Sequence, residues 1–442
     1  MSLLSELQLK IERKDVKLAV IGLGYVGLPV GCEFARAGFE VIGIEVHSDR
    51  VNKINSGISP IEGIEPGFSE LLSEVVSSGR LCATTDYQLL IDCDVVLIDV
   101  ETPVDEQNVP RYYALRSALQ SLGPVLKIGS LVIIESTIAP GTMDKLVLPL
   151  LSRFSGKVLN TDFFLGNCPE RVMPGKLLSN LRNVSRVVGG MNPETSQAMV
   201  SLYRHIVQAE LDPTDCLTTE LAKTVENAYR DVQIAFANEI ALICEVLGGD
   251  VWKLRELVNK SPFRNMHLPG AGVGGHCIPK DPWLLTSSVK DASIPIHLIP
   301  AARKVNDYMP LHMANLLVDT LESVNCDLTE ARVLVMGFAY IENSDDTRNS
   351  PSDKLINYLR DLGVNFRIHD PYIDKYNGDL LEIAQDCDAA VVMVKHQQYL
   401  HLDLEGLKSV LRTPILIDGR HLYDPAKVKS IGFKYRGVGQ GI

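Results

Sequence analysis

The chain has 442 residues, a formal net charge of −12 and 46% apolar residues. This length exceeds one ordinary core, so two or three domains of a soluble globular protein are expected. The acidic balance argues against nucleic acid or an anionic membrane as partner, and no apolar run is long enough to span a bilayer. The N-terminus lacks a basic-then-apolar signal, which favours the cytoplasm.

The nine cysteines are scattered along the chain and odd in number. None forms a C-x-x-C pair, so neither a zinc site nor a disulfide framework is indicated, and no metal is expected. Reduced thiols also fit the cytoplasm. Most of the cysteines, Cys32 and Cys244 among them, are expected to be small core side chains.

The N-terminal elements are expected in the order strand, glycine turn, helix, strand. The first strand is predicted over 17–21, the helix to about Gly38, and the second strand over 41–45. Further strands over 94–99 and 131–135 alternate with helical stretches. This alternation predicts a parallel sheet with helices on both faces.

The turn after the first strand has the sequence Gly22-x-Gly24-x-x-Gly27, and Glu45 ends the second strand. Glycines at these positions allow a tight turn and close approach of a pyrophosphate to the helix N-terminus, while the carboxylate accepts a hydrogen bond from a ribose hydroxyl. The negative charge of Glu45 would repel the extra phosphate of NADP, so NAD is the expected cofactor. A glycine turn without a ligand is the alternative.

A long amphipathic helix is predicted over 218–248, closed by Gly248 and Gly249. Such a helix can bridge two domains, and its apolar stripe can also pair subunits. The apolar residues of this stripe are Leu221, Val225, Val232, Phe236, Ile240, Ile243 and Leu247.

A second α/β unit is predicted after about residue 328, so the expected fold is α/β, with two doubly wound Rossmann-like domains joined by the long helix. Its strands are predicted over 333–337, 366–368, 389–394 and 415–417. A helix over 352–362 is expected to turn Leu355, Ile356, Leu359 and Leu362 inward. The predicted domains are 1–215 for NAD binding, 216–325 for a central helical domain, and 326–442 for the second α/β unit.

The most informative residue is Cys277, which lies in the segment Gly272-Val273-Gly274-Gly275-His276-Cys277-Ile278-Pro279-Lys280-Asp281-Pro282-Trp283. Glycine permits close approach of substrate, and the prolines hold the following chain extended. A nucleophilic thiol must be reached by substrate and needs charged neighbours that tune its thiolate. A tight turn with an incidental cysteine is the alternative.

Other polar residues are candidates for chemistry. Lys223 and Asn227 share one helix face and could stabilise an oxyanion, although a surface lysine is an alternative. Glu170 is either a general base or the ion-pair partner of Arg171. Arg348, near a predicted helix N-terminus, either binds a phosphate or ribose or lies in a solvated loop with a capping aspartate.

In combination, these motifs resemble the UDP-glucose/UDP-N-acetylmannosamine 6-dehydrogenase family from about Lys17 to Arg420. The supporting motifs, in chain order, are Gly22-Leu23-Gly24-Tyr25-Val26-Gly27-Leu28-Pro29, Thr102-Pro103-Val104, Ser136-Thr137, Pro140-Gly141-Thr142, Pro169-Glu170-Arg171, Glu220-Leu221-Ala222-Lys223, Asn238-Glu239, the Cys277 segment and Asp345-Asp346-Thr347-Arg348.

The resemblance implies an NAD-dependent, four-electron oxidation of a sugar C6 alcohol to a carboxylate. Cys277 would capture the aldehyde as a thiohemiacetal, and a second oxidation would give a thioester that water hydrolyses. Lys223 and Asn227 match positions that stabilise the oxyanion, Asp281 and Thr137 match positions that hold the catalytic water, and Glu170 matches the proposed base for hydrolysis.

The resemblance also implies the binding residues. Those for the cofactor are Gly22, Gly24, Tyr25, Val26, Gly27, Glu45, Arg50, Thr102, Pro103, Thr137 and Arg348. Those for the UDP-sugar are Glu170, Arg171, Val172, Lys223, Asn227, Arg264, Gly274, His276 and Arg420.

Within the family, the Gly-Gly-His-Cys segment resembles the branch that oxidises UDP-N-acetylhexosamines. Arg264 matches an arginine donated to the neighbouring subunit, which implies a homodimer or higher oligomer. The chain departs from the family at Ile341, where a lysine is usual, at Arg111, where an aspartate is common, and at Glu45, where aspartate is more frequent. Alternatives are a UDP-glucose 6-dehydrogenase or a two-electron enzyme similar to 6-phosphogluconate dehydrogenase, although the latter needs no cysteine.

Overall fold

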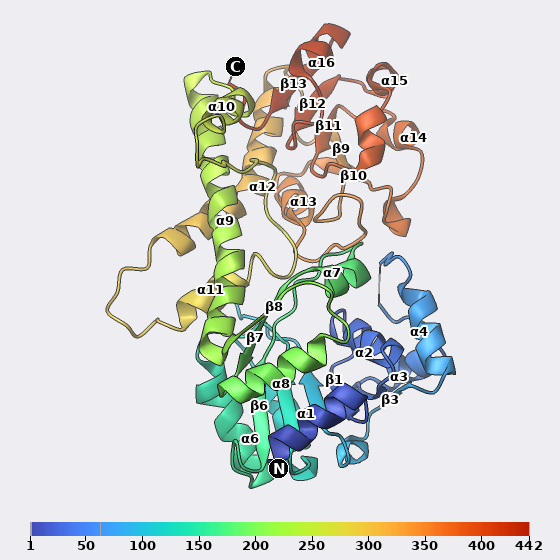
Figure 1. The fold of residues 1–442 in the computed structure, drawn as a ribbon. Helices are drawn as coiled ribbons and strands as arrows, with labels where there is room; N and C mark the ends of the chain where they lie inside the picture. Colours follow the sequence, from blue (N-terminus) through green and yellow to red (C-terminus); the bar gives the residue numbers. More distant parts are fainter. Residues whose placement is uncertain (1, 62, 442) are drawn as a thin grey trace. The chain divides into compact units, whose positions relative to one another are not determined.

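The structure is a computed structural model that describes residues 2–61 and 63–441 (Figure 1). These residues form two compact units. The first consists of Met1–Glu226 and Trp283–Ile294, and the second of Asn227–Pro282 and Pro295–Ile442. The prediction of two Rossmann-like α/β sheets with a long helix between them in the chain is confirmed. The boundaries of three domains at residues 215 and 325 stay a prediction.

The described part of the first unit contains an eight-stranded sheet in the order β3-β2-β1-β4-β5-β6-β7-β8. Strands β1 to β6 are parallel, whereas β7 pairs antiparallel with β6 and parallel with β8. The expected parallel sheet is thus extended by an edge that runs in the opposite direction. The strands are β1 (Lys17–Ile21), β2 (Glu40–Ile44), β3 (Leu81–Thr84), β4 (Val95–Ile98), β5 (Ser130–Ile134), β6 (Phe163–Asn167), β7 (Arg186–Gly190) and β8 (Leu211–Asp215).

Alternation along the central strands gives this sheet two buried faces. On β1, Leu18 and Val20 pack into one core, and Ala19 and Ile21 pack into the other. The first core is covered by α1 (Leu3–Arg13), α2 (Gly27–Arg36), α3 (Ser48–Asn55), α4 (Phe68–Ser77), α7 (Leu177–Asn183) and α8 (Pro193–Tyr203). The second is covered by η1 (Tyr87–Leu90), α5 (Tyr113–Leu122), η2 (Gly123–Val125), η3 (Met143–Val147) and α6 (Leu148–Ser155).

The second unit contains a parallel sheet in the order β10-β9-β11-β12-β13. Its strands are β9 (Arg332–Met336), β10 (Asn365–His369), β11 (Ala389–Val392), β12 (Ile415–Asp418) and β13 (Lys434–Gly437). The helical elements that follow α9 (Cys216–Leu247) in the chain are α10 (Val251–Val258), α11 (Asp281–Ser287), α12 (Leu298–Glu322), α13 (Pro351–Asp361), η4 (Asp374–Tyr376), α14 (Leu380–Ala384), η5 (Gln397–His401), α15 (Leu404–Val410) and α16 (Pro425–Ile431). Most of α11, from Trp283 on, belongs to the first unit.

The prediction for Leu362 is wrong. Leu355, Ile356 and Leu359 are buried in the core, but Leu362 is 44% exposed. It follows the last residue of α13, where Gly363 turns the chain with a positive φ of 74°. The helical repeat that placed Leu362 inward therefore no longer applies at this position.

The predicted long helix is confirmed as α9 (Cys216–Leu247), which passes from the first unit into the second after Glu226. Several of its apolar residues remain exposed, with Phe236 at 55% and Leu247 at 78%. Cys32 and Cys244 are buried as expected. Within residues 2–61 and 63–441, no helix combines the length and apolar character needed to cross a bilayer.

Candidate active site

In the glycine turn after β1, Gly22 and Gly27 are packed against backbone atoms, whereas Gly24 borders empty space. Gly22 has a φ of 98°, and a Cβ there would lie 2.5 Å from the backbone oxygen of Asp99. A Cβ at Gly27 would lie 2.0 Å from the Gly22 oxygen, whereas a Cβ at Gly24 would meet no atom within 4 Å. The turn is thus packed tightly beneath the helix and leaves free space at Gly24, as a pyrophosphate site requires.

Glu45 directly follows β2 and is held at the rim of this turn. Its carboxylate lies 3.2 Å from Arg50 Nε and accepts a hydrogen bond from the His47 backbone N–H at 3.1 Å. Arg50 also donates to the backbone oxygens of Leu23 at 2.8 Å and Pro60 at 3.2 Å. Arg50 therefore links the predicted ribose acceptor to the glycine turn.

Two further predicted cofactor residues are brought together at the carboxyl edge of the sheet. Thr102 Oγ1 donates to the Thr137 backbone oxygen at 2.6 Å. The adjacent Pro103 oxygen accepts from the Arg111 N–H at 2.7 Å. Arg111, one of the departures from the family pattern, forms an ion pair with Asp105 in its own loop. The phenol of Tyr25 donates to Glu65.

Glu170 and Arg171 point to different partners. A carboxylate oxygen of Glu170 lies 2.7 Å from Nη2 of Arg186, whose side chain is 1% exposed. Arg171 instead pairs with Glu226 at 2.9 Å. The alternative of a Glu170–Arg171 ion pair is therefore wrong, although the Arg171 backbone N–H donates to Glu170 at 2.6 Å. Val172 packs against the first core.

Arg186 was missed by the sequence reasoning. A charged residue that opens the otherwise apolar strand Arg186–Gly190 is the signal that could have revealed it, because an arginine in such a place needs a buried acidic partner.

Lys223 and Asn227 lie four residues apart on α9. Lys223 is only 7% exposed, which excludes the surface-lysine alternative, and its Nζ lies 3.2 Å from Glu226. Asn227 donates from its amide to a carboxylate oxygen of Asp281 at 2.6 Å. The helix thus presents a shielded cation and an oriented amide on one face.

Cys277 is exposed, and its backbone oxygen accepts from the N–H groups of Lys280 at 3.1 Å and Asp281 at 2.9 Å. Asp281 is fully buried, and Lys280 Nζ lies 3.0 Å from its second carboxylate oxygen. His276 keeps contact with solvent, but the protein around its ring and the cations Lys280 and Arg348 lower its pKa to about 4. Its imidazole is therefore neutral near pH 7.

The segment before Cys277 packs against the loop that follows β9. The Gly275 N–H donates to the Arg348 oxygen at 2.9 Å, and the Asn349 amide donates to the Gly275 oxygen at 3.0 Å. A Cβ at Gly274 or Gly275 would lie 2.7 Å from the side chain of Tyr340. These glycines are therefore required by Tyr340 and Asn349, which the sequence reasoning did not single out.

The remaining predicted arginines differ in their surroundings. Arg348 binds both carboxylate oxygens of Asp346, at 2.9 and 3.0 Å from Nε. Arg420 donates to the backbone oxygens of Met393 at 2.7 Å and Gly272 at 3.3 Å, so it holds the chain that leads to Cys277. Arg264 is exposed and donates to the Pro262 oxygen at 3.1 Å.

The helix that follows Arg348, α13, is capped by the side chain of Ser350, which accepts from the Ser352 N–H at 3.1 Å. The prediction that an aspartate caps this helix is therefore wrong, because the N-cap of α13 is a serine.

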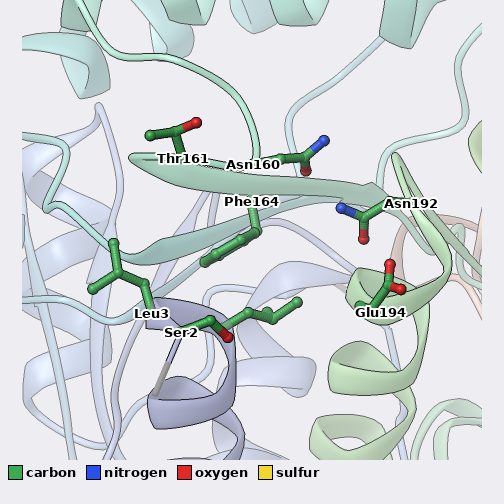
Figure 2. A pocket seen from close by; sticks show the side chains of 8 residues that line it. Ser2, Leu3, Asn160, Thr161, Phe164, Asn192 and Glu194 are labelled. Atoms are coloured by element: carbon green, nitrogen blue, oxygen red, sulfur yellow. The ribbon is translucent and has the colours of Figure 1, made fainter.

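A separate hollow in the first unit lies beside the start of α1 (Figure 2). Its lining residues are Ser2, Leu3, Leu4, Asn160, Thr161, Phe164, Asn192 and Glu194. They include none of the predicted site residues, and we assign it no role.

The fold, the glycine turn and Glu45 define an NAD-dependent oxidoreductase. Three models of the UDP-glucose/GDP-mannose dehydrogenase family match the chain: the NAD binding domain at residues 16–207, the central domain at 217–308 and the UDP binding domain at 334–425. The chain therefore belongs to this family, and its cofactor is NAD, as predicted.

Similar proteins agree with this assignment. The chain is 39% identical to UDP-N-acetyl-D-mannosamine dehydrogenase of Pyrococcus horikoshii, with 96% of this chain and 100% of the relative covered. The solved structure of the UDP-D-ManNAc dehydrogenase of Pyrococcus horikoshii matches with a TM-score of 0.90 over 96% of this chain and 99% of the other. An NDP-N-acetyl-D-galactosaminuronic acid dehydrogenase of Methanosarcina mazei matches with a TM-score of 0.85 and 35% identity over 100% and 98% of the two chains.

Proposed function

We propose that this protein oxidises the C6 hydroxymethyl group of a UDP-N-acetylhexosamine to a carboxylate, with Cys277 as the covalent nucleophile. The observation that supports it most is the exposed cysteine beside the Asn227–Asp281–Lys280 network, in a chain of the UDP-glucose/GDP-mannose dehydrogenase family. The named relatives act on N-acetylhexosamine nucleotides, which supports this branch over UDP-glucose.

The first unit fits NAD. The open space at Gly24 receives the pyrophosphate, and Glu45 accepts a hydrogen bond from the ribose. NAD, when bound, accepts the hydride in each of the two oxidations. Thr102 and Thr137 border the same edge of the sheet, and Tyr25, Val26, Pro103 and Arg348 complete the proposed set of cofactor residues.

The chain's own groups carry the covalent steps. The thiol of Cys277 adds to the C6 aldehyde and later leaves from the thioester when water attacks. Lys223 and Asn227 stabilise the oxyanion of each tetrahedral species with a positive charge and an N–H group. The burial of Lys223 supports this role, because a charge in a shielded site acts more strongly than one in water.

Asp281 and Thr137 hold the hydrolytic water. One oxygen of Asp281 accepts the Asn227 amide, while Oδ1 is shielded from solvent and faces the ammonium group of Lys280 at 3.0 Å. A water molecule held beside this carboxylate would occupy a further lone pair of Oδ1. Glu170 takes the proton of that water. The proposed UDP-sugar site includes the catalytic residues Lys223 and Asn227 and, in addition, Glu170, Arg171, Val172, Gly274, His276 and Arg420.

The test measures NADH formed per sugar consumed with UDP-ManNAc, UDP-GlcNAc, UDP-GalNAc and UDP-glucose. We expect about two NADH per sugar, since an alcohol-to-carboxylate oxidation releases four electrons, and an N-acetylated sugar as the preferred substrate. One NADH per sugar would support the two-electron alternative, and preference for UDP-glucose would move the enzyme to the other branch.

The exposed apolar face of α9 supports a homodimer. Its large side chains on this face include Leu221, Val225, Tyr229, Phe236, Ile243, Val246 and Leu247, each at least 37% exposed. A row of this kind along one helix is typical of an interface. Replacement of Phe236 by lysine is expected to shift the sedimentation mass from dimer to monomer, while an unchanged mass would place the interface elsewhere.

Arg264 reaches the partner subunit's substrate site in such a dimer. The adjacent Phe263 is fully exposed and has a φ of 63°, a strained conformation for a bulky residue. We expect mixed dimers of Arg264→Ala and Cys277→Ser chains to recover activity that neither homodimer has, because one site of the mixed dimer keeps both residues. No recovery would mean that Arg264 acts within its own chain.

The proposed location is the cytoplasm, where a catalytic cysteine stays reduced. The proposed domains are 1–215 for NAD binding, 216–325 for the central helical part with Cys277, and 326–442 for UDP-sugar binding.

A further inference from the structure

A network of ionisable side chains, all buried except the half-buried Asp99, lies at the carboxyl edge of the first sheet. Asp99 follows β4, Glu135 follows β5, Glu170 follows β6, Arg186 begins β7 and Tyr203 ends α8. Glu135 and Tyr203 are 2% and 0% exposed, and Arg186 is 1% exposed. Each element thus contributes one ionisable side chain to this edge.

The contacts connect these groups into one chain. Arg186 lies 2.7 Å from Glu170 and 3.7 Å from Glu135, and its guanidinium lies 5.2 Å from the centre of the Tyr203 ring. The Tyr203 hydroxyl donates to Glu135 Oε1 at 2.5 Å. The carboxyl groups of Asp99 and Glu135 lie within reach of a side-chain hydrogen bond.

The charges of this network do not balance if every acid is ionised. Three carboxyl groups face one guanidinium, and Oδ2 of Asp99 and Oε2 of Glu135 are shielded from solvent without a donor in the part of the chain that the structure describes. Two carboxylates cannot hydrogen-bond to each other unless one of them has a proton. A single proton on Asp99 supplies the missing donor and reduces the repulsion.

The directions of the pKa shifts agree with one proton bound by the Asp99–Glu135 pair. Burial, together with the charge of Glu135 and the hydrogen bond to it, raises the pKa of Asp99 well above its ordinary value. Burial also raises the pKa of Glu135, against the effects of Asp99, Arg186 and Tyr203. The neighbouring Cys168 does not compete for the charge, because burial raises its pKa to about 12.

We propose that Asp99 and Glu135 share one proton in the folded enzyme, and that this pair is a positioning device that keeps Arg186 in place against Glu170. The protonated pair leaves Arg186 with one full negative neighbour at hydrogen-bond distance, Glu170. If Asp99 loses its proton, the charge beside Glu135 draws the guanidinium away from Glu170. The functional consequence rests on the proposed role of Glu170, but the shared proton does not.

The proposal fixes the direction of a pH effect. The folded pKa of Asp99 lies above its unfolded value of about 3.9, so the folded state retains a proton that the unfolded state releases. Its contribution to stability is complete below that unfolded value and is lost as the pH rises through the folded pKa. Over that window the unfolding equilibrium constant is expected to rise about ten-fold per pH unit from this proton alone.

The test compares the full chain with Asp99→Asn by denaturant unfolding at a series of pH values from 5 to 9, because the steep window ends at the folded pKa of Asp99. An asparagine amide donates to Glu135 as the protonated acid does, so the ten-fold dependence per pH unit is expected to disappear in the variant. The matched control is Asp94→Asn at the other end of β4. Although burial opposes it, hydrogen bonds and charge from Lys127, Lys17 and Lys10 lower the Asp94 pKa, so this variant should shift stability equally at every pH in the range.

The infrared spectrum gives a measurement that needs no variant to be stable. The wild-type protein is expected to show the C=O stretch of a protonated carboxylic acid at pH 7, and Asp99→Asn should lose it. An unchanged spectrum, or equal pH slopes in wild type and Asp99→Asn, would overturn the shared proton.

The positioning role has its own readout. Asp99→Ala removes the donor to Glu135, and kcat is expected to fall about ten- to hundred-fold with a smaller change in KM for the UDP-sugar, while Asp99→Asn should recover most of the loss. Equal losses in both variants would overturn the positioning role. Glu170→Gln tests the proposed function separately, because an unchanged rate of thioester hydrolysis would remove Glu170 as the base and leave the proton measurements intact.

Discussion

The two sheets repeat one local plan but use it in opposite ways. In each, the first strand is followed directly by a glycine of positive φ, Gly22 at 98° after β1 and Gly337 at 90° after β9. The neighbouring strand is followed directly by an acid, Glu45 after β2 and Asp370 after β10. Gly22 donates to the Ile44 oxygen as Gly337 does to the His369 oxygen.

The difference lies in what the acid binds. Glu45 is tied to Arg50 and the His47 N–H at the rim of an open turn. Asp370 is fully buried and accepts from the N–H groups of Phe338, Ala339 and Tyr372 and from His396. The second turn is thus closed by its own carboxylate, whereas the first keeps its open space for a ligand. A shared topology therefore does not give a shared site.

The largest effect is expected from Cys277, the proposed nucleophile, which lies in the second unit. Cys277→Ser should lower turnover at least about 1,000-fold, because no equivalent nucleophile remains, while NAD binding to the first unit persists. Activity assays and NAD titration measure the two properties. The control is Cys82→Ser, which replaces an exposed cysteine of the first unit and should change neither. Full turnover by Cys277→Ser would contradict the covalent mechanism.

The closed turn should depend on Asp370 for stability. Although burial opposes it, the hydrogen bonds from His396, Ala339 and Tyr372 lower the Asp370 pKa. In Asp370→Asn, the amide NH2 group takes the place of a carboxylate oxygen and faces N–H donors that it cannot accept from. We therefore expect the second unit to lose about 3 kcal/mol of unfolding free energy.

Tryptophan fluorescence can follow this loss, since Trp252 lies in the second unit and Trp283 in the first. Denaturant unfolding of Asp370→Asn in a Trp283→Phe background reports the second unit alone. The exposed Asp374→Asn is the control and should change little. An unaltered midpoint for Asp370→Asn would mean that the turn holds its shape without the buried acid.

Much of this architecture could be predicted because it follows from local patterns. The alternation of buried residues on the central strands, the glycine turn and the long helix all appear in the sequence, and α9 (Cys216–Leu247) lies within two residues of its predicted ends. The site required more. The roles of Arg186 and Asp99 depend on partners 16 to 51 residues away, and the antiparallel β7 depends on pairing that no local signal specifies.

The open turn should separate ligand binding from stability. Gly24→Ala adds a methyl group where no protein atom lies within 4 Å, so unfolding should be unchanged while NAD affinity falls more than about ten-fold. Gly27→Ala, whose Cβ would lie 2.0 Å from the Gly22 oxygen, should lose both stability and NAD affinity. Isothermal titration measures the NAD affinity of the two variants, and thermal unfolding measures their stability. Unchanged NAD affinity in Gly24→Ala would place the pyrophosphate elsewhere.

The smallest effect is expected at Glu45, the counterpart of the buried Asp370. Glu45→Gln keeps an acceptor for the ribose but removes the charge, so NAD affinity should fall about five-fold. Discrimination against NADP should weaken further, because the repelling carboxylate is gone and Arg50, 3.2 Å away in the wild type, is released to meet the extra phosphate. The ratio of kcat/KM for NAD and NADP measures this change, with Glu40→Gln on the same strand as control. If the ratio stays constant, Glu45 resembles Asp370 in binding only groups of the protein and does not contact the ribose of the cofactor.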